Sequence, residues 1–173
     1  MNLFDRAAET LRACRRIGAT LVTVESCTGG LVAAALTEVP GSSDVFDRAF
    51  VTYSNDAKHR MVGVTKKALR EHGAVSDVVA RAMAEGGLRL SGATVAVSLT
   101  GVAGPGGGTA DKPVGLVHIA CAVEGRETLA ERHLWRLSEP VADRQRIRAL
   151  SARAALELVM RAVDQAERTS LRP

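Results

Sequence analysis

The sequence predicts an α/β protein, a three-layer α/β/α sandwich in which helices cover both faces of a mixed β-sheet. In the first half of the chain, segments of apolar and β-branched residues alternate with helical segments. Two later strand segments are joined by a short turn, which indicates a hairpin and therefore antiparallel pairing. The 173 residues contain no internal repeat and no long linker, so we expect one domain over residues 1–173.

Helices and strands alternate through the first half of the chain. Apolar residues from Leu3 to Cys14 recur at helical spacing and predict an opening helix that stops near Gly18. Thr65 and Ser76 are expected to cap later helices, because their hydroxyls can accept backbone N–H groups of a first turn. The expected elements are a strand at 21–24, a helix at 31–36, a strand at 48–53, and helices at 56–62, 66–71 and 77–90.

The second half of the chain contains the remaining strands. Residues 93–99 form an apolar run that is consistent with a buried strand, and residues 101–108 are too rich in glycine to be helical. The remaining expected elements are strands at 113–123 and 128–136 around a turn at Glu124 and Gly125, and a long helix at 142–167.

Composition and charge exclude several classes of function. The net charge is +4, but basic residues are interspersed with acids, which indicates a solvated surface and no nucleic-acid partner. Aromatic residues make up 3% of the chain, too few for base-stacking platforms. Three cysteines without paired spacing predict neither disulfides nor a zinc site. The sequence lacks a signal-peptide pattern and a membrane-spanning run, so we expect no membrane partner and a cytoplasmic location.

The turn after the first strand is the strongest functional feature. Residues 24–30 join an apolar strand to an alanine-rich helix and contain Ser26, Cys27 and Thr28. N–H groups of such a turn stabilise an anion, or an oxygen that becomes one, at the positive end of the helix dipole. The alternative is structural, with glycines that allow a tight turn and Thr28 as a helix cap. Either Ser26 or Cys27 could be a nucleophile, although free cysteines are mostly buried apolar residues.

Two other clusters also follow strand ends. They are the glycine-rich segment 100–108 and the segment from Tyr53 to Lys58. Ligands of open α/β sheets bind outside the carboxyl ends of strands, so we expect a phosphate or ribose pocket where these loops meet. The alternatives are a flexible surface loop and a solvated lysine. A Lys58 that is desolvated beside a serine would lose its proton more easily and act as a base.

A series of short motifs resembles the CinA C-terminal domain family. The motifs are ESCTGG (25–30), PGSS (40–43), VTYSN (51–55), AK (57–58), HGAVS (72–76), GVAGP (101–105) and KPVG (112–115). The resemblance covers about residues 5–165. Members include stand-alone deamidases that hydrolyse the carboxamide of nicotinamide mononucleotide to nicotinate mononucleotide and ammonia. The resemblance implies the CinA fold, a nucleotide substrate, no metal and no cofactor. It also implies a single-domain form and a homo-oligomer.

The resemblance implies roles for individual residues. Ser26 would be the nucleophile and Lys58 its general base, while Tyr53, Ser43 and Thr100 would shape or polarise the site. From the turn itself, we expect N–H groups of residues 27–30 to hold an oxyanion, each worth about 3 kcal/mol. The expected substrate-binding residues are Glu25, Cys27, Thr28, Gly29, Gly30, Ser43, Thr100, Gly101, Ala103, Gly104, Arg144 and Arg146.

Several alternatives stay open at this point. Glu25 could orient a ribose hydroxyl or the lysine, or make a simple turn hydrogen bond. Either Arg144 or Arg146 is the candidate for the 5′-phosphate. His118 lies in an apolar strand and is expected to be a satisfied core residue. The chain could instead be a catalytically silent nucleotide-binding regulatory module, or an amidase for another small anionic amide. The presence of both Ser26 and Lys58 favours activity.

Overall fold

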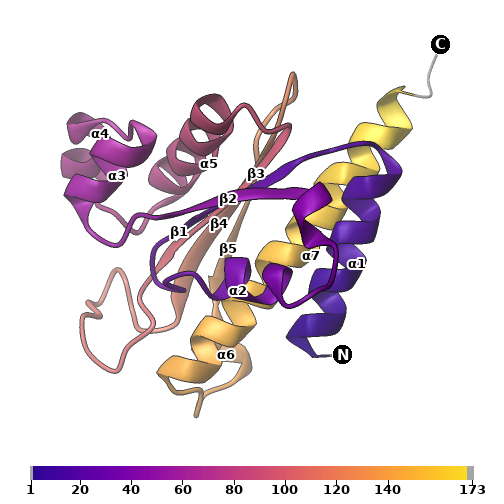
Figure 1. Cartoon of the computed structure of the whole chain (residues 1–173). Coiled ribbons are helices and arrows are strands. Elements are labelled where there is room, and N and C mark those ends of the chain that lie inside the picture. Colours follow the sequence, from indigo (N-terminus) through magenta and orange to yellow (C-terminus); the bar gives the residue numbers. More distant parts are fainter. Residues whose placement is uncertain (1, 171–173) are drawn as a thin grey trace.

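A five-stranded mixed sheet forms the centre of the protein, in a computed structural model that describes residues 2–170 (Figure 1). The order of the strands is β2-β1-β3-β4-β5. β1 is parallel to both β2 and β3, whereas β4 is antiparallel to both β3 and β5. The strands are β1 (Leu21–Glu25), β2 (Phe46–Val51), β3 (Val95–Gly101), β4 (Leu116–Val123) and β5 (Leu129–Leu134).

Helices cover both faces of this sheet, so the predicted three-layer α/β/α fold is confirmed (Figure 1). One layer contains α1 (Leu3–Arg16), α2 (Leu31–Thr37) and α7 (Arg144–Ser170). The other contains α5 (Asp77–Ser91), with α3 (Asn55–Val62) and α4 (Lys66–His72) packed beside it. Short helical segments are η1 (Ser42–Asp44) and α6 (Trp135–Ser138). No helix within residues 2–170 is both long and apolar enough to span a bilayer.

The two faces of β3 divide the core. Val95, Val97 and Leu99 belong to the main apolar cluster, together with residues of α1 and α7. On the opposite face, α5 packs through small residues, and the Ser98 hydroxyl donates to the Ala80 carbonyl at 2.6 Å. Small side chains allow a helix to approach a sheet closely. This contact fixes α5, and therefore the segment that precedes α5, against the end of β3.

The predicted boundaries of the strands differ from those in the structure. β2 runs from 46 to 51 and not from 48 to 53, so Thr52 and Tyr53 leave the sheet. β3 continues through Gly101, which therefore lies in a strand and not in the glycine-rich loop. β4 begins at Leu116 because its N–H group donates to the Pro113 carbonyl in a turn.

The end of the predicted hairpin is helical. Leu134 is the last residue of β5 that pairs with β4, opposite Leu116. Beyond this pair, the Trp135 indole N–H donates to the Ser151 hydroxyl on α7 at 2.9 Å. This bond turns the chain into α6, so the prediction of a strand through residue 136 was wrong.

We expect Gly86→Ala to destabilise the protein. A Cβ atom at Gly86 on α5 would lie 1.8 Å from the Val62 carbonyl oxygen on α3. Overpacking costs about 1–3 kcal/mol, which exceeds the gain of up to about 1 kcal/mol for alanine in a helix. Urea denaturation measures the free energy of unfolding. Gly106→Ala is the matched control, because a Cβ atom there meets open space. Equal stability of the two variants would contradict this packing.

Candidate active site

Ser26 and Lys58 meet in a buried contact at the carboxyl ends of β1 and β2. Lys58 Nζ lies 2.9 Å from Ser26 Oγ and 2.8 Å from the Thr52 carbonyl oxygen. The Lys58 side chain is 1% exposed, and both of these partners are neutral. Ser26 directly follows β1, while Lys58 lies in α3, whose first turn is capped by the Ser54 hydroxyl. The predicted proximity of Ser26 and Lys58 is confirmed.

Burial changes the proton affinity of this lysine. It lowers the pKa of Lys58 from 10.5 to about 8, and a smaller electrostatic effect of Cys27 opposes this change. A protein interior without a counter-ion disfavours the ammonium form. A substantial fraction of Lys58 is therefore neutral at mildly alkaline pH. The neutral amine can accept the proton of the Ser26 hydroxyl, with which it is already in hydrogen-bond contact.

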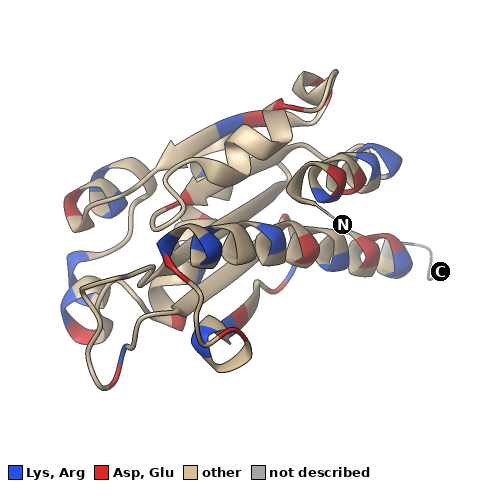
Figure 2. Cartoon of the chain, turned by 90° about the horizontal axis from the view of Figure 1, so that it is seen from below, with Lys and Arg blue, Asp and Glu red and all other residues tan. Residues whose placement is uncertain are grey.

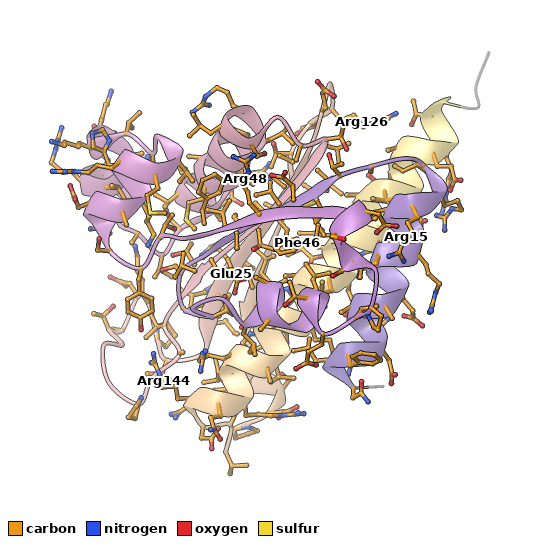
Figure 3. The ribbon with its side chains drawn as sticks, in the orientation of Figure 1. Arg15, Glu25, Phe46, Arg48, Arg126 and Arg144 are labelled. Carbon is orange, nitrogen blue, oxygen red and sulfur yellow. The ribbon has the colours of Figure 1, made fainter. Side chains whose placement is uncertain are left out.

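Glu25 supports the turn from inside the protein and does not line the cleft described below. Its carboxylate is fully buried and accepts N–H groups of Gly30, Val32 and Ala33 at 2.9–3.1 Å. It thus occupies the positive end of α2, where an anion was expected. The expectation that Glu25 contacts the substrate was wrong, and the alternative of a turn hydrogen bond was correct. In Figure 3, the label of Glu25 lies near the middle of the molecule, and the label of Arg144 lies away from it.

Only part of the expected oxyanion site is free. Gly29 N–H donates to the Ser26 carbonyl at 3.0 Å, and Gly30 N–H donates to Glu25. These two glycines serve the turn, with φ of 58° and 96°, and the expectation that their N–H groups bind substrate was wrong. Within residues 2–170, the N–H groups of Cys27 and Thr28 donate to no protein oxygen. They are the candidate oxyanion donors.

A cleft of about 240 Å³ opens beside the Ser26–Lys58 pair. Its walls come from the ends of β1 and β3, from α3, from the segment before α5 and from the start of α7. Most of its residues were predicted, but Asn55, Ala74 and Val75 were missed, although each lies in a motif of the family resemblance. The lining residues are Ser26, Cys27, Tyr53, Asn55, Lys58, Ala74, Val75, Thr100, Gly101, Ala103 and Arg144.

A larger hollow elsewhere is a weaker candidate. It measures about 860 Å³ and lies between α1, β5 and α7. Its charged side chains largely neutralise one another, as in the ion pairs of Arg6 with Glu157 and of Arg16 with Asp164. The cleft at Ser26 is smaller, but it contains a buried lysine in contact with a possible nucleophile. Perturbed titratable groups in a cleft are typical of active sites.

Arg144 lies across the mouth of the cleft. Its guanidinium donates to the Gly104 carbonyl at 2.7 Å and to the Tyr53 hydroxyl at 2.9 Å. Tyr53 is 60% exposed, so this contact is at the surface. Figure 2 shows basic residues gathered at the beginning of the long C-terminal helix, and both signs of charge along the rest of that helix. An anionic group at the mouth would meet Arg144 first.

Arg146 and Ser43 do not belong to this cleft. Arg146 forms an exposed ion pair with Glu139 at 2.6 Å, because a residue two positions from Arg144 points to another side of the helix. Ser43 lies in η1 before the amino end of β2, beside the Arg15–Asp44 ion pair. Figure 3 shows Arg15 and Phe46, at the start of β2, on the side away from Arg144. Of these two predicted site residues, neither lines the cleft beside Ser26.

The remaining predicted polar residues are buried or form hydrogen bonds within the protein. Burial raises the pKa of the Cys27 thiol to about 11, so the thiol stays protonated and is a poor nucleophile. The Thr100 hydroxyl donates to the Ala74 carbonyl at 2.8 Å and fixes that wall of the cleft. The Thr28 side chain is fully buried and does not line the cleft, so its expected contact with substrate depends on its backbone N–H group.

His118 differs from its expected role in one respect. It is 8% exposed in β4, and burial lowers the pKa of its imidazole. Within residues 2–170, however, its Nδ1 atom has no hydrogen-bond partner, so it is not a satisfied core residue. In the same range, no group of three or more His, Cys, Asp or Glu side chains is arranged to hold a metal ion.

The fold and the serine–lysine cleft define an α/β/α domain whose site lies at the carboxyl ends of its parallel strands. The sequence profile of the CinA C-terminal domain matches residues 4–163, and the chain therefore belongs to this family. A CinA-like protein of Syntrophobacter fumaroxidans is 52% identical over 147 residues, which are 85% of this chain and 33% of that protein. One of Gloeobacter violaceus is 48% identical over 150 residues, or 86% of this chain and 34% of that protein. The chain thus spans about a third of the length of these relatives.

Solved structures show the same fold. The competence/damage inducible protein CihA from Agrobacterium tumefaciens superimposes with a TM-score of 0.89 at 44% identity, and the match covers 95% of this chain and 96% of that chain. A CinA superfamily protein from Klebsiella pneumoniae gives a TM-score of 0.88 at 31% identity, covering 95% and 99% of the two chains.

We expect Glu25→Ala to destabilise the protein strongly. The substitution removes an acceptor from three N–H groups at the start of α2, and buried donors without partners are costly. The free energy of unfolding should fall by about 3 kcal/mol in urea titrations. Glu38→Ala, at an exposed position beyond the same helix, should change it by less than about 0.5 kcal/mol. Equal effects of the two substitutions would contradict the assigned role of Glu25.

Proposed function

We propose that the protein hydrolyses the carboxamide of nicotinamide mononucleotide to nicotinate mononucleotide and ammonia. One observation carries the proposal: a lysine that is 1% exposed lies 2.9 Å from a serine hydroxyl in a cleft. Membership of the CinA C-terminal domain family supports it. The names of the relatives specify neither substrate nor reaction, so the choice of substrate rests on the motif resemblance.

The first half of the reaction is an acyl transfer to Ser26. Neutral Lys58 takes the hydroxyl proton as Ser26 Oγ attacks the carboxamide carbon, which becomes tetrahedral and places negative charge on its oxygen. The N–H groups of Cys27 and Thr28 would stabilise this oxyanion. When the C–N bond breaks, the protonated Lys58 returns the proton to the leaving nitrogen. Ammonia departs and a nicotinoyl ester of Ser26 remains.

The second half of the reaction releases the acid. Lys58, neutral again, takes a proton from a water molecule that attacks the ester carbonyl carbon. The same oxyanion donors act on the second tetrahedral intermediate. The C–O bond to Ser26 then breaks, and the proton on Lys58 returns to the serine oxygen. The products are nicotinate mononucleotide and the regenerated serine.

The rest of the cleft fits a nucleotide with an anionic end. Arg144 lies at the cleft mouth, where its guanidinium already binds a carbonyl and a phenol oxygen. We assign it to the 5′-phosphate, because a guanidinium forms bidentate bonds with phosphate oxygens. Tyr53 would give up its bond to Arg144 when phosphate binds. Thr100 and Ala103 would form the wall beside the sugar.

Release of ammonia from nicotinamide mononucleotide tests the function directly. Wild-type protein should turn over, whereas Ser26→Ala and Lys58→Ala should each lower kcat by about 10³-fold or more, because they remove the nucleophile and its base. Arg146→Met, at an exposed ion pair outside the cleft, is the control and should retain full activity. If the protein binds the nucleotide but releases no ammonia, the result would favour the catalytically silent regulatory module. If the protein hydrolyses other amides but not nicotinamide mononucleotide, the proposed substrate would be rejected.

The pKa of Lys58 predicts the pH dependence of the reaction. The base acts only when neutral, so kcat/KM should fall as the pH drops through about 8, by about tenfold for each pH unit below it. Above that value the rate should reach a plateau. Rates measured from about pH 6 to 9.5 give the profile. A flat profile over this range would contradict the role of Lys58 as general base.

A further inference from the structure

Arg148 connects α7 with the turn that carries Ser26. It lies one helical turn after Arg144, on the same side of α7, and is half-buried. Its Nη2 atom donates to the Thr28 carbonyl oxygen at 2.7 Å, a contact between residues 120 positions apart. Arg148 does not line the cleft. Any effect of Arg148 on the reaction is therefore exerted through the turn and not by contact with substrate.

The bond from Arg148 fixes one particular peptide group. The Thr28–Gly29 peptide is planar, so its carbonyl and its N–H group point in opposite directions. Arg148 binds the carbonyl, while the N–H group of Gly29 donates to the Ser26 carbonyl at 3.0 Å. Both edges of this peptide are thus held.

The two candidate donors, the N–H groups of Cys27 and Thr28, lie between anchored parts of the backbone. The Cys27 N–H group also interacts with the sulfur of its own side chain and opposes the rise in the pKa of that thiol. Before the two donors, the N–H group of Ser26 donates to the Leu99 carbonyl of β3 at 3.0 Å. After them comes the Thr28–Gly29 peptide, and then the N–H groups that Glu25 binds. The Thr28 carbonyl also accepts the N–H group of Leu31 at 3.3 Å. Loss of the Arg148 bond would therefore leave this carbonyl with only the longer of its two hydrogen bonds.

We infer that Arg148 is a positioning residue, which holds the Thr28 carbonyl from α7 and thereby aims the N–H groups of Cys27 and Thr28 at the developing oxyanion. This inference rests on the proposed function for its catalytic consequence. The half-buried charge also acts on the turn, since it opposes the rise that burial causes in the pKa of the Cys27 thiol. A fixed positive charge on this side of the turn would favour an oxyanion.

The kinetics of Arg148→Met test the inference. Preorganised donors act mainly in the transition state, and a small misplacement of such groups can cost about 10²-fold in rate. We expect kcat to fall by roughly 100-fold while KM changes less than about twofold. Arg148→Lys can still donate to the carbonyl and should recover part of the loss. Arg146→Met is the control on the same helix.

Hydrogen exchange of the turn amides provides a readout that needs no substrate. In Arg148→Met, the amides of Gly29 and Gly30, which are hydrogen-bonded within the turn, should exchange faster than in wild-type protein and in Arg146→Met. Amides of β3 should be unchanged. If Arg148→Met unfolds globally, exchange will rise both in the turn and in β3. The same comparison is then made with Arg148→Lys, which keeps a positive charge at this position.

The outcomes separate the two claims. Unchanged kcat in an active enzyme, or a rise in KM alone, would overturn the positioning role. If wild-type protein releases no ammonia, the proposed function is rejected. Hydrogen exchange is then the test of whether Arg148 holds the Thr28 peptide. Faster exchange confined to the turn would then support its hold on the Thr28 peptide, and unchanged exchange would overturn it.

Discussion

The site depends on one contact, between the buried amine of Lys58 and the hydroxyl of Ser26. An ammonium group is disfavoured in an interior where its hydrogen-bond partners are neutral, so burial makes this lysine a base at accessible pH. The contact requires α3 to begin directly after β2 and to lie against the end of β1. Parallel pairing of these strands brings both chain segments to the same edge of the sheet. The position of α3 therefore brings the lysine amine into contact with the serine hydroxyl.

The turn that carries Ser26 is held by two opposite charges. Glu25 occupies the N–H groups at the start of α2, and Arg148 binds a carbonyl of the same turn from α7. Because Glu25 neutralises the helix end internally, the helix dipole is not the anion site that the sequence pattern indicated. The free donors are instead the amides directly after the serine. This arrangement leaves the N–H groups of Cys27 and Thr28, which follow Ser26 in the chain, as the candidate oxyanion donors.

Much of the fold could be predicted from local patterns in the sequence, whereas the pairing of Ser26 with Lys58 was implied by the family resemblance. Strand–helix alternation determined the sandwich, and residues after strand ends marked the cleft. The directions in which side chains point were harder to predict. Helical spacing places Arg144 and Arg148 on the same side of α7, whereas the prediction named Arg144 and Arg146. Ser43 was misplaced because its motif gave no indication of which end of β2 it would reach. The carboxylate of Glu25 could not be assigned, since its partners are backbone groups that only the folded turn presents.

The central claim is that Lys58 is buried and readily loses its proton. Its pKa can be measured directly by NMR titration of the protein labelled with ¹⁵N-lysine, with Lys58→Arg used to assign the signal. We expect a titration midpoint near 8 for Lys58, well below the value of about 10.4 that is usual for an unperturbed lysine. A midpoint near that usual value would contradict the role of Lys58 as a base.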